Sequence, residues 1–463
     1  MPTNLARDLG ALVKGRVLDD AAARAETSGD FGRMIVRHPG VVVRPDSTDD
    51  VAAVIRYARR VSIPIATRGQ AHSQSGQSLT DGGILLDLNA LDRILAVDSA
   101  ALQADCQAGV RWETLVQRTI PAGVIPPVLT NNLGVTVGGT LSVAGLGVAS
   151  FRHGTQGDNV TEIEAVTGAG DVVICSPTLE RELFDAVRSG MGQFGVITRA
   201  RLGLRRCLPR ARTYYLLYDD LQALMRDAGT LIDEDRVDDL EAWCTPCPQG
   251  FRWTGGAKEA FASWFFPLQA TVEFEPTSPP DDRTRLKGLS PYRRVHIEDQ
   301  DLIDFARRLE PLFGLWKRSG YWGAAHPWME VVLPWQTAGP FITQVLAGLP
   351  PTALGGGHIL LWPSRGTSSS VPLFMTPSSP LVMGFGVLPG IPPDLLPQAR
   401  QRLNMLSDLS VQAGGKRYLS GFIEFDGPRW RRHFGPAWDR VRLLKTTYDP
   451  DGILNPGFID FRA

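Results

Sequence analysis

A histidine inside a glycine-rich loop is the strongest chemical signal in this sequence. The stretch 68–77 reads Arg-Gly-Gln-Ala-His-Ser-Gln-Ser-Gly-Gln and follows a short apolar run at 63–66 that ends a predicted strand. Small residues let such a loop turn tightly and bring backbone N–H groups close to an anion. One imidazole nitrogen of His72 can attack an electrophilic carbon while the other keeps its proton. The alternative is a glycine turn with a solvated histidine, and because a lone short motif is weak evidence, this stretch does not decide between the two.

A second segment has the composition of a ligand-binding loop. Residues 129–145 read Leu-Thr-Asn-Asn-Leu-Gly-Val-Thr-Val-Gly-Gly-Thr-Leu-Ser-Val-Ala-Gly. This segment is too rich in glycine and hydroxyl side chains for a core element, and it predicts tight turns that offer N–H and O–H groups to a polyanionic ligand. A surface loop without function is the alternative, but such loops of this length are uncommon.

A third segment carries a G-x-G-x-x-G at Gly190, Gly192 and Gly195. A dinucleotide-binding fingerprint must follow a strand and open a helix. Here residues 177–189 predict a helix, capped by Ser176 or Thr178 and stopped by Gly190, and residues 196–204 alternate like a strand. The order is reversed, so the sequence argues against a dinucleotide-binding site of this type.

The elements around these segments predict an α+β domain of about 200 residues followed by a separate lobe. A helix is expected at 47–60 with Ser47 as its cap, a second helix at 112–119, and strands at 63–67, 84–88 and 103–108. Residues 162–167 and 171–175 predict a hairpin. Eight of the eleven tryptophans lie between Trp243 and Trp362. They indicate either an aromatic pocket for a flat substrate or the core face of a sheet.

The composition fits two globular domains and does not indicate a nucleic acid or a membrane as partner. The chain has 463 residues, 43% of them hydrophobic and 21% charged, with a formal net charge of −1. This balance gives no electrostatic case for a nucleic acid or a membrane surface as partner. We expect no transmembrane helix and no signal peptide. The five cysteines suggest no disulfide framework, and a cytoplasmic location is the simpler expectation.

The pair Cys244 and Cys247 has the spacing of a redox or metal motif. A zinc site would want a second pair of ligands at suitable spacing, which the other three cysteines do not supply. We therefore predict no metal site.

Taken together, the three segments resemble the cytokinin dehydrogenase branch of the vanillyl-alcohol-oxidase/p-cresol methylhydroxylase (PCMH) superfamily of flavoproteins. The likeness covers nearly the whole chain. Its shared motifs lie at 30–32, 44–47, 68–77, 136–142, 151–154, 192–201, 326–328, 433–439 and 448–457. The resemblance implies a PCMH-type FAD-binding domain at 1–205, a substrate-binding cap domain built on an antiparallel sheet at 206–420, and a return to the FAD-binding domain at 421–463.

The resemblance also implies how the cofactor is held. FAD would be attached through its 8α carbon to His72, without a second link, since the turn at 131–139 has no cysteine. The residues expected to bind FAD are Arg68, Gly69, Gln70, Ala71, His72, Ser73, Gly76, Gln77, Thr130, Asn131, Val135, Thr136, Gly138, Gly139, Ser142, Gly145, Val196, Ile197, Tyr418 and Asn455.

The sequence departs from the family at the positions that would handle the substrate's proton. Cytokinin dehydrogenases use an aspartate where this chain has Asn131, and an amide cannot accept a proton at neutral pH. Glu241 matches a second family carboxylate and is the first candidate for the base. Asp158 is an added carboxylate and the second candidate. Asn455 begins an altered C-terminal motif, Asn-Pro-Gly-Phe in place of Ser-Pro-Gly-Gln.

These departures favour an FAD-linked oxidoreductase that oxidises an amine or alcohol carbon of a small, flat or aromatic molecule other than the family's N6-isopentenyl adenine. Oxygen or another acceptor would reoxidise the flavin. Three alternatives stay open: a true cytokinin dehydrogenase using another base, an alcohol or sugar oxidase, and an FAD-binding electron-transfer subunit. The large middle lobe weighs against the last, and fold alone does not decide among them.

Overall fold

The first two hundred residues build two small sheets in the computed structural model, which describes residues 5–254 and 256–461. The four-stranded sheet has the order β1-β2-β4-β3. Its strands are β1 (Arg16–Leu18), β2 (Val41–Arg44), β4 (Ile84–Asp87) and β3 (Ile65–Arg68), with β2, β4 and β3 parallel. The predicted helix is α3 (Thr48–Val61), and the Ser47 side chain accepts from Asp50 N–H as expected. Its apolar stripe packs on this sheet.

The five-stranded antiparallel sheet has the order β5-β6-β10-β8-β9. Its strands are β5 (Ile94–Asp98), β6 (Gln103–Gln107), β10 (Val196–Gly203), β8 (Val160–Val166) and β9 (Val172–Cys175). Strands β8 and β9 pair as the predicted hairpin. The helix α4 (Trp112–Thr119) has the expected bounds and packs in the same core.

One predicted helix is shorter than expected. The sequence predicts a helix at 177–189, but α7 begins at Arg181 and ends at Val187 (Arg181–Val187). Ser176 Oγ instead accepts from the N–H groups of Thr178 and Leu179 and forms a turn, so it does not cap the helix. The glycine motif still follows this helix and precedes β10, which confirms that it is not a dinucleotide-binding fingerprint.

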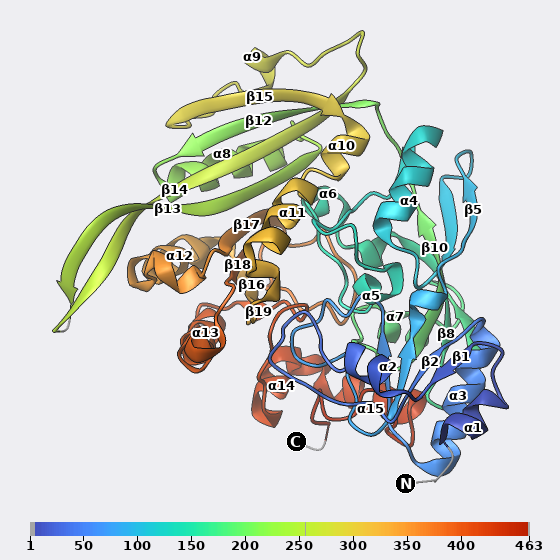
Figure 1. Cartoon of the computed structure of the whole chain (residues 1–463). Helices are drawn as coiled ribbons and strands as arrows, with labels where there is room; N and C mark the ends of the chain where they lie inside the picture. Colours follow the sequence, from blue (N-terminus) through green and yellow to red (C-terminus); the bar gives the residue numbers. More distant parts are fainter. Residues whose placement is uncertain (1–4, 255, 462–463) are drawn as a thin grey trace.

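The second lobe is built on one antiparallel sheet of order β15-β12-β14-β13-β17-β18-β16-β19 (Figure 1). Its strands are β15 (Arg293–Asp301), β12 (Arg210–Tyr218), β14 (Ala257–Phe274), β13 (Asp239–Thr254), β17 (His358–Arg365), β18 (Leu381–Leu388), β16 (Met329–Pro334) and β19 (Lys416–Arg417). The molecule is thus a two-lobed α+β protein, as predicted.

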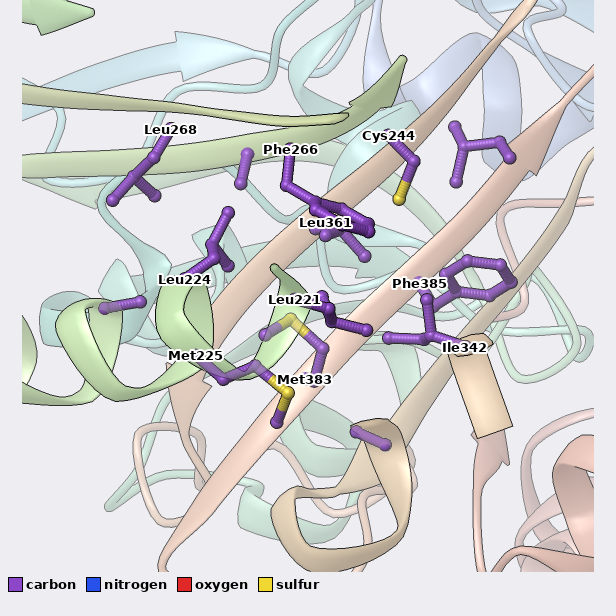
Figure 2. Packing of buried hydrophobic residues seen from close by; sticks show 14 of the residues in the cluster. Leu221, Leu224, Met225, Cys244, Phe266, Leu268, Ile342, Leu361, Met383 and Phe385 are labelled. Atoms are coloured by element: carbon purple, nitrogen blue, oxygen red, sulfur yellow. The ribbon is translucent and has the colours of Figure 1, made fainter. Parts of the chain in front are cut away.

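One face of this sheet is core. Leu361, Met383 and Phe385 point toward α8 (Leu221–Asp233) and α12 (Trp335–Gly348) and are fully buried (Figure 2). Side chains alternate between the two faces of a strand, so the residues next to these three along β17 and β18 face the other way. That second face forms one wall of the cavity described below.

The C-terminal segment packs against the first lobe. Helices α14 (Gly427–Phe434) and α15 (Trp438–Tyr448) share an apolar cluster with Met191 and Phe194. Ile65 N–H donates to Ile453 O, beside β3. The remaining α-helices and strands of the described residues are α1 (Leu5–Gly10), α2 (Ala21–Glu26), β7 (Val124–Ile125), α5 (Val137–Leu141), α6 (Ser150–His153), β11 (Arg205–Arg206), α9 (Asp282–Arg285), α10 (Leu302–Ala306), α11 (Glu310–Ser319) and α13 (Leu396–Gln412).

None of the helices in the described ranges combines the length and hydropathy that a membrane span requires.

Candidate active site

A cavity of about 340 Å³ lies where the loops of the first lobe meet the outward face of the large sheet. All the residues that the sequence analysis assigns to FAD line it, with the exception of Gly76, and so does Glu241. Segments that are far apart in the sequence, 67–78, 130–148, 191–197, 418–420 and Asn455, therefore meet at one place.

His72 is held in an aromatic stack. Its ring lies 4.0 Å from that of Phe31, and the His326 ring stacks on the opposite side of Phe31 at 4.2 Å. The preceding residue, Ala71, has φ +49°, a strained conformation for a non-glycine residue, and its carbonyl accepts from Phe31 N–H. Burial, with a smaller contribution from His326, lowers the pKa of His72 to about 4. The imidazole is therefore neutral at pH 7, and its Nε2 has no hydrogen-bond partner.

The two glycine-rich loops approach each other closely in the cavity wall. A Cβ added to Gly69 would lie 2.2 Å from Thr136 Oγ1 of the second loop, and one added to Gly138 would lie 2.7 Å from the Cβ of Ala108, the residue after β6. Only glycine allows this backbone separation. The two loops therefore pack tightly against each other. Their small residues leave room in the cavity for a ligand.

Asn131, Glu241 and Arg308 form a closed cluster at one end of the cavity. Arg308 Nη2 donates to Glu241 Oε1 at 2.9 Å and to Asn131 Oδ1 at 2.7 Å, and Arg308 Nε also donates to Glu241 Oε1 at 3.0 Å. Asn131 Nδ2 donates to Glu241 Oε2 at 3.2 Å. The oxygen and the nitrogen of the Asn131 amide both make hydrogen bonds, and the Glu241 carboxylate has the Arg308 guanidinium as its one cationic partner in the cluster.

Asp158, expected as a second candidate base, does not line the cavity. Its Oδ2 accepts from the N–H and hydroxyl of Thr155, and its Oδ1 accepts from the N–H and hydroxyl of Ser370. Thr155 and Asp158 form a capping box around a turn of 3₁₀-helix. Both oxygens of the carboxylate are engaged in fixing this turn and Asp158 is absent from the cavity lining, so the geometry does not support a role as base.

Gly76 is also outside the cavity lining. Its N–H donates to Asp30 Oδ2, which also accepts from Ser73 Oγ. Burial raises the pKa of Asp30 to about 6. Gly76 shapes the loop from behind, at φ +71°, and makes no part of the cavity wall.

Aromatic side chains form a large part of the opposite wall. Five of the eight tryptophans of the second lobe line the cavity: Trp243, Trp316, Trp322, Trp328 and Trp362. The aromatic-pocket interpretation holds for these five, while Trp264 and Trp335 pack against the core. In the motif at 326–328 only Trp328 reaches the cavity, since His326 is fully buried behind Phe31.

Sequence reasoning missed three side chains of the site, Arg308, Glu330 and His358. The alternation of His358, Leu360 and Trp362 on β17 was a readable signal, because all three line the cavity. Arg308 lies in the turn between α10 and α11 and has no motif of its own.

The cysteine pair has no redox geometry. Cys244 and Cys247 lie three residues apart on β13, where an extended strand sends them to opposite faces. All five cysteines are free, and burial raises the pKa of Cys244. Within the described ranges, no group of three or more His, Cys, Asp or Glu side chains is placed to hold a metal ion.

Comparison with known proteins agrees with this layout. Residues 39–176 match the family model of an FAD binding domain. Residues 285–461 match the model "Cytokinin dehydrogenase 1, FAD and cytokinin binding". Cytokinin dehydrogenase 6 of Oryza sativa subsp. japonica is 33% identical, over 96% of this chain and 90% of its own length. Cytokinin dehydrogenase 4 of Arabidopsis thaliana is 30% identical, over 95% and 91%. An uncharacterized oxidoreductase, ORF5 in the fasciation locus of Rhodococcoides fascians, is 32% identical, over 93% and 95%.

Proposed function

Because this chain belongs to the cytokinin dehydrogenase family of FAD-linked oxidoreductases, we propose that it carries FAD on His72 and oxidises a small, flat amine or alcohol other than isopentenyl adenine. The observation that carries the substrate part of this proposal is the amide of Asn131, which stands where the family resemblance implies a carboxylate.

The residues present fit FAD. His72 offers a neutral imidazole with an unpartnered nitrogen at the cavity, which suits attack on an electrophilic carbon. The small residues of the two loops leave the backbone accessible to a large, polyanionic ligand. The Asn455 Oδ1 atom at the same cavity is also buried without a partner. When bound, FAD supplies the acceptor for a hydride leaving the substrate carbon.

The protein's own residues bind and orient the substrate. The five tryptophans give a broad apolar surface that suits a flat molecule and excludes water. The Arg308 guanidinium fixes which way the Asn131 amide points, with its oxygen toward Arg308 and its nitrogen toward Glu241. The Asn131 amide has a second N–H that can hydrogen-bond a substrate, but it cannot take a proton.

Cytokinin oxidation is the second candidate, favoured by the printed names of the relatives and by the position of Glu241 beside Asn131. An alcohol or sugar oxidase stays an alternative, because the C–H face of a sugar ring also stacks on tryptophan. The aromatic wall weighs against an electron-transfer subunit, which needs no substrate pocket. The electron acceptor and a cytoplasmic location stay predictions.

The test is an anaerobic screen of amines and alcohols, read as bleaching of the flavin absorbance. We expect isopentenyl adenine to reduce the flavin slowly or not at all, and at least one other flat amine or alcohol to reduce it fast. In Asn131→Asp a carboxylate, which can accept a proton, replaces the amide beside Glu241. That variant should gain activity on isopentenyl adenine. Fast reduction of the unaltered protein by cytokinins would promote the second candidate.

A further inference from the structure

Glu330 is a second carboxylate in the cavity, well separated from the Asn131–Arg308–Glu241 cluster. It lies on β16, while Glu241 lies on β13, and the sheet order places β17 and β18 between them. Three strand spacings amount to about 14 Å, so the two carboxylates stand at opposite ends of the cavity wall. No motif in the sequence singled out Glu330.

The space in front of Glu330 is open because two positions of β18 lack side chains. Glu330 pairs with Gly386, and Trp362 pairs with Gly384, on which its indole lies. A Cβ added to Gly386 would lie 3.3 Å from Trp362 Cζ3 and 3.5 Å from Glu330 Cγ. The indole and the carboxylate therefore flank one glycine, and both line the cavity. A flat molecule stacked on Trp362 would bring its edge to Glu330.

Glu330 takes part in no ion pair among the described residues. The Ser420 hydroxyl donates to Glu330 Oε2 at 2.8 Å. Arg417 is the nearest cation, but its guanidinium donates to Ser407 Oγ, to Phe422 O and to the backbone carbonyl of Glu330. The Glu330 carboxylate can therefore accept further hydrogen bonds, and no cation among the described residues is paired with it.

The electrostatics of this position favour a proton acceptor. Burial raises the pKa of Glu330 to about 7, against smaller opposing contributions from Ser420 and Arg417. The Tyr418 phenol is the other titratable group beside it, and the pKa of Tyr418 is itself raised, by burial first and by Glu330 second. A pKa near the working pH is what a general base needs.

Glu241 differs from Glu330 in its hydrogen bonds. Both of its oxygens already accept hydrogen bonds, two from Arg308 on Oε1 and one from Asn131 on Oε2. This arrangement suits a residue that binds and orients the substrate. The sequence predicts Glu241 as the base, so Glu241 and Glu330 are now two candidates for that role.

We propose that Glu330 is the catalytic carboxylate that takes the substrate's proton, and that the substrate is a flat aromatic amine or alcohol which stacks on Trp362 and presents its N–H or O–H to Glu330. This inference rests on the proposed function. In the reaction the C–H bond breaks and its electron pair leaves as hydride to the bound FAD. The N–H or O–H bond breaks, its proton goes to a Glu330 oxygen, and its electrons form the C=N or C=O bond. The proton then passes to solvent.

The kinetic test compares Glu330→Gln with Glu241→Gln, using the best substrate from the screen and stopped-flow reduction across pH. The unaltered protein should reduce faster as pH rises through about 7, because the acceptor must be ionised. Glu330→Gln should slow the limiting reduction rate by at least about 10²-fold and lose this pH dependence. Glu241→Gln should mainly raise the substrate concentration needed for half-saturation. Glu298→Gln, on β15 with Tyr215 O–H as its partner, is the matched control and should behave like the unaltered protein.

A second readout needs no turnover. Infrared difference spectra of the substrate-free holoprotein between about pH 5 and about pH 9 should show carboxylic acids that deprotonate near pH 7, because burial raises the pKa of both Glu330 and Asp239 to about 7. This signal should be smaller in Glu330→Gln and unchanged in Glu298→Gln. Ser420→Ala removes the hydroxyl that lowers the pKa of Glu330, so it should move both this transition and the rate profile to higher pH.

The outcomes separate this inference from the proposed function. If no amine or alcohol reduces the flavin while the infrared transition is present, the proposed function fails. If reduction is normal in Glu330→Gln, or if its pH dependence is lost only in Glu241→Gln, Glu330 is not the proton acceptor. An infrared signal near pH 7 that is as large in Glu330→Gln as in the unaltered protein would also overturn the inference.

Discussion

Replacing Arg308 with methionine is expected to lower the free energy of unfolding by about 3–5 kcal/mol. The Glu241 side chain is only 4% exposed, and the Arg308 side chain 14%. Removing the guanidinium leaves the Glu241 carboxylate buried without its cation, because Asn131 supplies a single neutral donor. Breaking a buried pair on one side costs far more than the pair contributes as a whole, since the desolvated charge stays behind. Denaturant titration of the two proteins measures the difference.

The neighbouring residue provides the control. Arg307 pairs with Glu113 at 2.9 Å, but its side chain is 42% exposed. Arg307→Met should therefore change the free energy of unfolding by at most about 1 kcal/mol. Adding Glu241→Gln to Arg308→Met should recover much of the loss, because the amide carries no charge. Equal effects of Arg307→Met and Arg308→Met, or no recovery in the double variant, would contradict the role given to this cluster.

Alanine at Gly384 should disturb both the fold and the aromatic wall. The new Cβ would lie 1.8 Å from Trp362 Cε2 and 1.9 Å from its Nε1, so the indole must leave its place. The core face of β18 is fully packed behind this position, and the space left for the ring is the cavity itself. We expect a loss of about 1–3 kcal/mol in the free energy of unfolding, as for other overpacked sites. Affinity for a flat substrate, measured by flavin-absorbance titration, should fall with it.

Gly386 is the matched position one step along the same face. Its added Cβ would meet Trp362 and Leu388 at 3.3 and 3.4 Å, which small shifts of the side chains relieve. Gly386→Ala should therefore cost clearly less stability than Gly384→Ala. If the two variants lose the same amount, the indole of Trp362 is not fixed by the absence of a side chain at Gly384.

Local sequence signals predicted most of the first lobe. The Ser47 cap, the alternation of β10 and the hairpin of β8 and β9 each depend on residues within a few positions of one another. The loop around His72 was also readable, because its glycines and its histidine are contiguous. The start of α7 was not, since Ser176 could cap either a helix or a turn and the turn prevailed.

The functional residues of the second lobe could not be predicted from the sequence, and the reason is physical. Glu330 faces the cavity because β16 pairs with β18 across a sheet whose strands come from distant parts of the chain. Arg308 reaches Glu241 across 67 residues. No local pattern encodes such contacts. Asp158 was a different case, because its spacing from Thr155 is that of a capping box and already pointed to a structural role.

The state of the flavin on His72 tests the proposed function most directly. Protein precipitated with acid should stay yellow, and a tryptic peptide containing His72 should carry the mass of the flavin. His72→Ala should still bind FAD, because the loops that cradle it are separate from the imidazole, but its precipitate should be colourless and its turnover slower. A colourless precipitate of the unaltered protein, with free FAD in the supernatant, would contradict the covalent link on which the proposed function is built.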